Sequence, residues 1–252
     1  MKRGIRAMVL VVGLSLFSVG IASATTSAGR FDASIQAKVT QTLAAKQQFS
    51  KIQTSVEDAI VTLTGSVDLY QQKLDAAKKV KKMANVQGVR NLITVAGKDV
   101  SDTALEEQLD RKLYYDRIGY DNLFNFMTAS VQNGVVTLNG EARNEYDRDS
   151  AISLVNTTPG VKDVVSNINV SPASIFDDRI RVQEARVIYR DPVLSRYAID
   201  PARPIRIVVN NGHVTLYGAV ANKMDKEVAG IRAGQVFGAF SVQNNLEVVG
   251  KS

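Results

Sequence analysis

Short runs of alternating apolar and polar residues occur three times along this chain of 252 residues. Each ends in nearly the same five residues: VTLTG at 61–65, VTLNG at 136–140 and VTLYG at 214–218. Another apolar run and a polar turn precede each copy, and alternation with a period of two is typical of β-strands. The pattern therefore predicts two strands joined by a hairpin, three times over.

The turn sequences of these hairpins differ in how well they suit a tight turn. Asn-Gly occupies 133–134 and 211–212, and this pair is favoured where a tight hairpin needs positive φ. The first copy has Glu-Asp-Ala at 57–59 instead, which predicts a poorer turn.

The glycines that end the repeated motif are Gly65, Gly140 and Gly218. We expect each to lie where the second strand gives way to the next element, with an unusual dihedral angle or close packing of a helix start. A structural role is favoured over ligand binding, because the chain contains no glycine-rich phosphate-binding motif.

Helical periodicity follows each glycine and also precedes each hairpin. Apolar residues at i, i+1, i+4 and i+7 predict a helix through 76–83 that packs on the sheet. It should stop near Asn85, Gly160 or Gly238, because Asn and Gly accept the left-handed conformation that ends helices. A third strand is expected at 164–170 and 242–248. Upstream, the four-residue spacing of Ile35, Val39 and Leu43 and of Leu105, Leu109 and Leu113 predicts an amphipathic helix, with Ser101-Asp102 as the second helix's N-cap and a less regular counterpart at 176–192.

Each unit thus reads helix, strand, strand, helix, strand. The fold class predicted is α+β: three tandem small αββαβ sandwiches, each a three-stranded mixed sheet with two helices on one face. We name them unit 1 (31–97), unit 2 (101–171) and unit 3 (174–250). Aligned on the glycines, 49–95, 124–170 and 202–248 superpose over 47 positions without a gap, with eight identical columns.

The N-terminal 24 residues have the pattern of a secretory signal peptide. Three basic residues precede an apolar run at 7–22, and Ala22-Ser23-Ala24 supplies the small residues of a cleavage site after Ala24. An uncleaved anchor is the alternative, although the run is shorter than the ~20 residues that span a bilayer. We therefore expect an exported protein, periplasmic or associated with the cell envelope.

Charge and cysteine content narrow the function classes. Loss of residues 1–24 lowers the formal charge from +6 to +3, so basicity argues weakly for nucleic acid and export argues against it. The absence of cysteine excludes disulfides, thiolate chemistry and a lipidated N-terminal Cys.

With its repeats, the chain resembles the BON domain, a family named for bacterial osmotically inducible and nodulation proteins. NGVVTLNGEA (133–142), NGHVTLYGAV (211–220), TPGVKDVVSNINV (158–170) and the preceding amphipathic helix carry the likeness. The resemblance implies a periplasmic or envelope-associated protein that attaches to phospholipid surfaces and serves osmotic stress or outer-membrane integrity. It supplies no lipid-contacting residue to transfer, only a tendency of helical faces to meet the membrane.

The residues do not predict an enzyme, a metal site or a cofactor. The single histidine, His213, follows Gly212 in a predicted turn and has neither Cys nor a second His as a partner. The acidic pairs at 57–58, 106–107 and 177–178 are sequence neighbours that point apart, so they are interpreted as solvated surface.

Two segments are candidates for contact with a lipid surface. Lys78, Lys79, Lys81 and Lys82, together with Lys73, form a basic stripe on the second helix of unit 1, suited to anionic headgroups. Tyr114 and Tyr115 begin an aromatic segment with interleaved cations at 113–126, suited to a membrane interface. A solvated helix face and a closed core are the respective alternatives.

The function predicted is a non-enzymatic envelope protein whose partner is an anionic phospholipid surface or an envelope protein. The alternative is a soluble periplasmic stress protein that binds unfolded or partner proteins without lipid contact. Three modules on one chain would add avidity to either contact. The sequence leaves open which lipid, stress and oligomeric state are involved.

Overall fold

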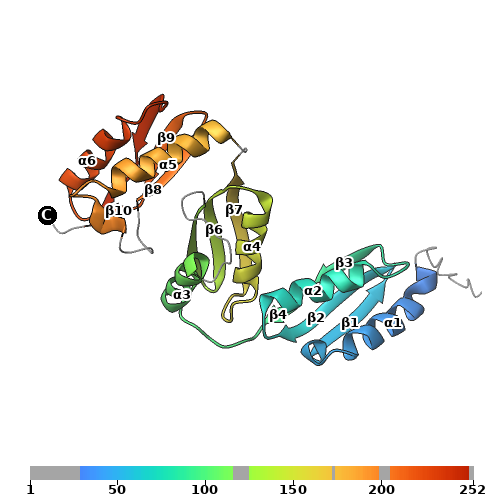
Figure 1. Cartoon of the computed structure of the whole chain (residues 1–252). Helices are drawn as coiled ribbons and strands as arrows, with labels where there is room; N and C mark the ends of the chain where they lie inside the picture. The colour runs from blue at the N-terminus through green and yellow to red at the C-terminus, as the bar shows by residue number, and fades with distance from the viewer. Residues whose placement is uncertain (1–28, 116–124, 172–173, 199–204, 250–252) are drawn as a thin grey trace, which may run out of the picture.

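The computed structural model describes residues 29–115, 125–171, 174–198 and 205–249. The signal peptide predicted at 1–24, and the part of the aromatic segment at 116–124, lie outside the described residues. The three units follow one another along the chain, with unit 2 in the middle (Figure 1).

Each unit has two helices on one face of a small sheet, as the sequence predicts. In unit 1 the elements are α1 (Asp32–Ala44), β1 (Ile52–Glu57), β2 (Ile60–Val67), α2 (Tyr70–Lys81), β3 (Gly88–Asn91) and β4 (Thr94–Val95). In unit 2 they are α3 (Asp102–Tyr115), β5 (Phe126–Gln132), β6 (Val135–Ala142), α4 (Glu145–Asn156) and β7 (Asp163–Val170).

Unit 3 repeats this order and, like unit 1 with η2 (Gln47–Phe49), also contains a short 3-10 helix. Its elements are α5 (Ile175–Tyr189), the 3-10 helix η3 (Ser195–Ala198), β8 (Arg206–Asn210), β9 (His213–Tyr217), β10 (Ala219–Val220), α6 (Lys223–Ala233), β11 (Ser241–Asn244) and β12 (Glu247–Val248). The α+β class and the αββαβ order are confirmed in all three units.

The strand that carries the VTLxG motif is central in every sheet. It pairs antiparallel with the strand before it and parallel with the strand after α2, α4 or α6. In unit 1 Val56 pairs with Val61, which pairs with Val89. The other units repeat this row of three valines. Three of the identical columns are therefore one line across the sheet.

The buried sides of the helices and sheet form one core per unit. In unit 1 Ile35, Val39 and Leu43 of α1 lie against Val61 and Leu63 of β2, all at most 2% exposed. The four-residue spacing read from the sequence thus marks the face of α1 that packs on the sheet.

Gly65 and Gly140 lie inside the central strand, several residues before the predicted junction with a helix, whereas Gly218 lies between the end of β9 and the start of β10. β2 and β6 continue past Gly65 and Gly140, and the helices begin only at Tyr70 and Glu145. The φ angles are +96°, +129° and, at Gly218, +119°. A Cβ on Gly140 would lie 1.8 Å from the carbonyl oxygen of Phe126 on the neighbouring strand. Left-handed backbone and close strand approach both require glycine there.

The second helix of each unit ends before the residue that the sequence marks as its stop. α2, α4 and α6 end at Lys81, Asn156 and Ala233. Asn85, Gly160 and Gly238 follow in the turn that leads to the third strand, with φ of +67°, +98° and +96°. The left-handed conformation is confirmed at all three positions, including the asparagine.

The third strand is broken in units 1 and 3 but continuous in unit 2. Asn91 and Asn244 occupy one column, and each side-chain amide donates to a carbonyl of the neighbouring helix, that of Lys73 or Lys226. The corresponding residue in unit 2 is Ser166, inside β7. Asn91 and Asn244 still pair with Leu63 and Leu216, but their side-chain oxygens accept from the amides of Ile93 and Leu246, two residues further on. This local turn takes the chain out of the ladder and explains the break.

Candidate functional site

The lysines of α2 form an exposed basic surface on unit 1. Lys78, Lys81 and Lys82 are exposed and Lys79 is half-buried, while Ala76 and Val80 on the opposite side of the helix are fully buried. The four lysines lie at the carboxyl end of α2, where the helix dipole favours cations. We call Lys78, Lys79, Lys81 and Lys82 the α2 lysines.

The ion pairs in the described part of the chain involve none of the α2 lysines. Lys73, one turn earlier, is half-buried, and its backbone carbonyl receives the Asn91 amide. The positive charge of the last turn is therefore offered to solvent or to an external anion.

Tyr114 lies at the contact between units 2 and 3, not beside the α2 lysines. Its ring is half-buried on α3, with the Arg206 guanidinium 5.5 Å from the ring centre. Arg206 also lies 5.8 Å from the ring of Phe126, which stacks on Tyr217 at 5.5 Å. Tyr115 is the last residue of α3, and its side chain lies outside the described part, so the predicted pair is placed only for Tyr114.

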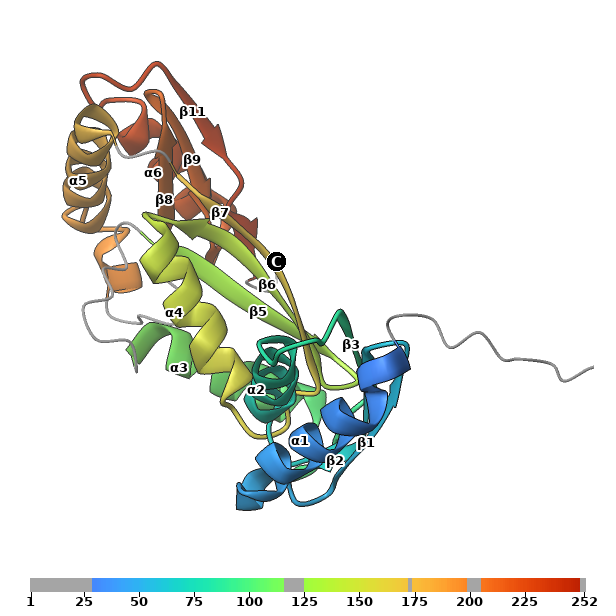
Figure 2. The same cartoon turned by 90° about the vertical axis from the view of Figure 1, so that its right-hand side faces the viewer.

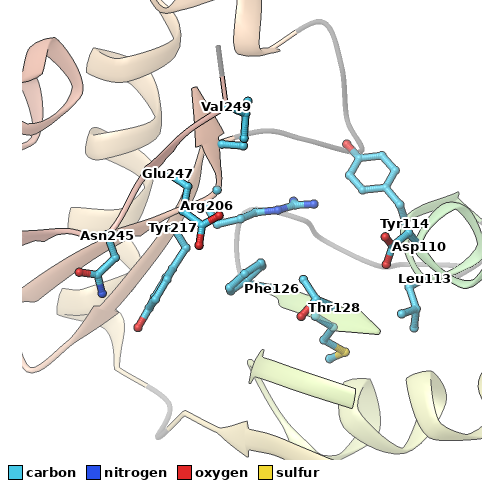
Figure 3. A pocket seen from close by; sticks show the side chains of 13 residues that line it. Asp110, Leu113, Tyr114, Phe126, Thr128, Arg206, Tyr217, Asn245, Glu247 and Val249 are labelled. Carbon is cyan, nitrogen blue, oxygen red and sulfur yellow. The ribbon is translucent and has the colours of Figure 1, made fainter. Parts of the chain in front are cut away.

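A cleft of about 520 Å³ opens beside these rings. Asp110 and Tyr114 reach it from α3, Arg206 from β8 and Glu247 from β12 (Figure 3). Because both carboxylates and the cation line the same opening, the cleft has no dominant charge. It lies between units 2 and 3, whereas the α2 lysines lie on unit 1.

The contact between units 1 and 2 is made by their second helices. Tyr70, at the start of α2, packs against the core of unit 2, and α2 lies beside α4 (Figure 2). Burial, with a hydrogen bond to Asp163, raises the pKa of Tyr70 to about 12. The phenol therefore stays neutral and acts as a structural donor.

An aspartate at the start of the first helix binds the hairpin turn in every unit. Asp32 accepts from the amides of Asp58 and Ala59 at 2.9 and 2.8 Å. Asp102 and Asp177 accept from both amides of the turns at 133–134 and 211–212. The turns of all three units have positive φ at both residues. Even the Asp-Ala turn, predicted to be poorer, is held in this geometry by a carboxylate.

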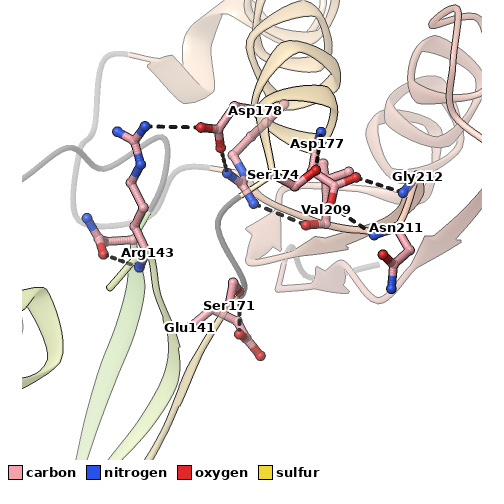
Figure 4. A network of polar contacts seen from close by, with 11 residues as sticks. Glu141, Arg143, Ser171, Ser174, Asp177, Asp178, Val209, Asn211 and Gly212 are labelled. Carbon is pink, nitrogen blue, oxygen red and sulfur yellow. Dashed lines mark hydrogen bonds and ion pairs between the residues drawn. The ribbon is translucent and has the colours of Figure 1, made fainter. Parts of the chain in front are cut away.

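This aspartate column was missed in the sequence. The sequence predicts a helix cap at Ser101-Asp102 and solvated surface at 177–178, whereas Asp102 also binds the hairpin turn and Asp177 is buried. The sequence does contain a usable signal. Each aspartate lies 3, 7 and 11 residues before the three positions of the first helix that face the sheet. Figure 4 shows Asp177 reaching Asn211 and Gly212.

Polar contacts also join units 2 and 3. Arg143 of unit 2 forms an ion pair with Asp178 at 3.0 Å, and Asp178 in turn binds Arg181 at 2.8 Å (Figure 4). Arg181 donates to the carbonyl of Val209, and burial lowers its pKa from the ordinary arginine value. Asp178 is thus committed to two guanidinium groups.

Glu184 is a buried carboxyl group in the core of unit 3. It is 0% exposed, and neither carboxyl oxygen has a hydrogen-bond partner among the described residues. Burial raises its pKa to about 8. The matching positions of the first helix in units 1 and 2 are Val39 and Leu109, both fully buried.

The described residues offer little for chemistry. They include no group of three or more His, Cys, Asp or Glu side chains close enough to hold a metal ion. His213 lies beside the turn, where its Nδ1 is 2.7 Å from the Ser241 hydroxyl. None of the helices in the described part is long and apolar enough to cross a membrane.

Known proteins resemble this chain to different degrees. An Anaplasma centrale protein, described as an uncharacterized protein in the gshII 5′ region, is 26% identical over 148 residues, 57% of this chain and 97% of the relative. The solved structure of CdsD, a structural protein of the Chlamydia trachomatis type III secretion system, aligns with 86% of this chain and 91% of its own, at 13% identity and a TM-score of 0.26. The PrgH periplasmic domain aligns with 79% and 95%, at 10% identity and a TM-score of 0.19. Such TM-scores are too low to transfer a function.

A family model gives the clearest result. The model of the BON domain matches residues 31–97, 101–172 and 193–250. The third match begins after α5, although α5 packs on β8 as α1 packs on β1 and α3 on β5. The three matches together span most of the chain, which therefore belongs to the BON domain family.

Proposed function

We propose that this protein is exported and binds anionic phospholipid at a membrane surface of the cell envelope, without catalysis. BON domains are a non-catalytic family, and membership fits a non-enzymatic envelope protein. In this proposal the three units act together, since linked weak contacts raise avidity.

The α2 lysines carry the proposal. Lys78, Lys81 and Lys82 are exposed within one turn of helix, and no carboxylate of the described part pairs with them. Anionic headgroups attract such cations with about 1 kcal/mol for each well-placed side chain. Four lysines are enough for a weak, reversible contact that other units then reinforce.

Cosedimentation of the mature chain with vesicles tests this function. Binding should be stronger to vesicles rich in phosphatidylglycerol than to vesicles of phosphatidylcholine, and the difference should shrink with salt, because screening acts over about 8 Å at physiological ionic strength. The variant with Lys78→Gln, Lys79→Gln, Lys81→Gln and Lys82→Gln should lose most of the preference for anionic lipid.

A matched variant separates position from net charge. Lys38, Lys46 and Lys51 are exposed lysines scattered over unit 1, and the exposed Lys98 follows that unit directly. Changing these four to Gln removes the same charge and should leave binding within about twofold, because Coulomb attraction falls steeply beyond a Debye length. Equal losses in both variants would reject a defined lysine site, and no sedimentation of the unmodified chain would reject lipid binding altogether.

A further inference from the structure

Three phenylalanine side chains protrude from one end of unit 3. Phe176 is 76% exposed at the start of α5, and Phe237 and Phe240 are 94% and 79% exposed in the loop between α6 and β11. With Ile180 and the hairpin turn at 211–212 they line a groove of about 650 Å³. Isolated exposed apolar residues are common, but a cluster gathered from separate segments marks a contact surface. We call Phe176, Phe237 and Phe240 the aromatic tip.

The fold does not require these rings. The columns of Phe237 and Phe240 hold Ala84 and Gln87 in unit 1 and Pro159 and Lys162 in unit 2. Only Phe176 has a counterpart, Phe31, which is less exposed at 42%. Units 1 and 2 therefore form the same turn and loop without aromatic side chains at the two loop positions.

The aromatic tip is partly preorganised. The ring of Phe240 lies against the turn, edge-on to His213 at 6.2 Å, and it occupies the space beside Gly212 that a Cβ would need. Phe237, in contrast, points into solvent with 6% of its surface covered. Phe240 is therefore held in place by its neighbours, and Phe237 protrudes beside it as a contact residue.

The polar groups around the aromatic tip leave a positive charge available. Asp177 is occupied by the two turn amides, and Asp178 pairs with Arg143 and Arg181. Arg179 also lines the groove and is exposed, and no ion pair of the described residues includes it. Apolar rings bordered by an uncommitted guanidinium are complementary to an anionic lipid interface.

The size of the patch also favours lipid over a protein partner. A phenylalanine offers about 150–250 Å², so three rings at these exposures present on the order of 500 Å². A stable protein interface covers about 800 Å² on each partner. A membrane interface has no such threshold, because each protruding ring gains by itself when it leaves water.

We propose that the aromatic tip inserts into the interfacial layer of a phospholipid bilayer, with Arg179 at the headgroups. The inference rests on the proposed function and adds a second contact of different chemistry. Contact through the α2 lysines is electrostatic and weakens with salt, whereas insertion of the rings is apolar and persists in high salt.

Tryptophan fluorescence tests the insertion directly, because the chain contains no Trp. Phe237→Trp creates a single reporter at the aromatic tip, and Tyr146→Trp places a control on α4 of unit 2, where Tyr146 is 77% exposed. With phosphatidylglycerol vesicles, the emission of the Phe237→Trp variant should shift to the blue and be quenched by nitroxide-labelled acyl chains. The Tyr146→Trp variant should show neither change.

Substitution tests the energetic role. Phe237→Ser with Phe240→Ser should weaken the binding that remains in high salt by about tenfold or more, since two large apolar side chains no longer leave water. Tyr146→Ser should change it less than twofold. Circular dichroism and the midpoint of thermal unfolding should match the unmodified chain, because Phe237 and Phe240 are 94% and 79% exposed.

The outcomes separate the two proposals. If the chain sediments with vesicles but the Phe237→Trp emission stays unchanged, the inference is wrong and lipid binding stands. Insertion at the tip that is indifferent to lipid charge and salt would support the inference and reject the lysine contact. A blue shift that follows protein concentration without lipid would identify a second copy of this chain as the occupant and overturn the inference. Absence of sedimentation in every condition rejects both.

Discussion

The corresponding ends of units 1 and 3 are built on the same backbone but carry opposite chemistry. In unit 1 this end has the lysines of the last turn of α2, whereas in unit 3 the column of Lys78 holds Ile231, which is 60% exposed, and the following loop carries Phe237 and Phe240. The turn below is held by Asp32 in one unit and by Asp177 in the other. The aspartate that holds the turn is thus the same in both units, whereas the exposed side chains near the turn differ.

The cores of the units differ at one comparable position. Val39 in unit 1 and Leu109 in unit 2 correspond to Glu184 in unit 3, and all three are fully buried. An unpartnered buried carboxyl group destabilises a fold that an apolar side chain would stabilise. Unit 3 therefore tolerates a cost that the other two units avoid, and it should be the unit whose stability depends most on pH.

The largest expected effect on stability comes from replacing Glu184 with an apolar residue like those of the other two units. Glu184 binds its proton up to about pH 8 in the folded chain, whereas in the unfolded chain it ionises near its ordinary value of 4.5. The folded state thus holds more protons between these pH values, so the free energy of unfolding of unit 3 falls as pH rises from 4.5 to 8. The full loss is on the order of 5 kcal/mol, and Glu184→Leu should abolish it.

Hydrogen exchange of unit 3 amides at several pH values measures this effect. The reciprocal variant Leu109→Glu should introduce the same pH dependence into unit 2. A pH profile of unit 3 that is identical in the unmodified chain and in Glu184→Leu would show that the carboxyl group is ionised and solvated in the folded protein.

The next largest effect comes from breaking what all units share. Gly140→Val should cost unit 2 about 3–5 kcal/mol, because the new Cβ meets the Phe126 carbonyl at 1.8 Å and φ is +129°. Denaturant unfolding followed by hydrogen exchange should place the loss in unit 2. A variant that unfolds at the unmodified midpoint would mean that the strands can separate there at no cost.

A smaller effect is expected from the aspartate that holds the turn. Asp177→Ala leaves two turn amides without their charged acceptor and should cost about 2–3 kcal/mol. Asp177→Asn retains one acceptor oxygen and should lose roughly half as much. The same pair of changes at Asp102 in unit 2 should give the same order of effects, because Asp102 also accepts from two turn amides.

The smallest effect concerns the turn residue itself. Gly134→Ala should cost unit 2 about 1 kcal/mol, because φ is +77° and the methyl would meet the Lys162 side chain at 2.9 Å. Ala59 in unit 1 holds the same place with φ of +62° and is buried. A thermal midpoint unchanged by Gly134→Ala would show that the Asp102 carboxylate compensates for the left-handed strain.

Much of the fold follows from periodicity in the sequence. Period two predicts the strands, the spacing of Ile35, Val39 and Leu43 predicts the face of a helix that packs on the sheet, and three copies of VTLxG predict three units. The ends of elements were less predictable. The strand runs past Gly140 because glycine removes the clash with the facing carbonyl, so the chain need not leave the sheet there.

The candidate site was predictable only in part. Helical spacing places Lys78, Lys81 and Lys82 on one exposed face, but whether an acid from another segment pairs with them depends on the fold. Tyr114 is a candidate in the sequence because aromatic and basic residues surround it. Its position beside Arg206 depends on how units 2 and 3 meet.

The sequence by itself determined the elements, their order and the repeated left-handed positions, because these depend on side-chain period and on local backbone sterics. Tertiary structure alone decided which distant residues meet. Phe176 is separated from Phe237 in the chain by β8, β9, β10 and α6, yet they border one groove. Asp177 reaches a turn 34 and 35 residues away, and Glu184 becomes isolated from water only when α5 packs on β8. The burial of a side chain and the meeting of distant residues depend on contacts between segments far apart in the chain. A local sequence pattern therefore cannot predict them.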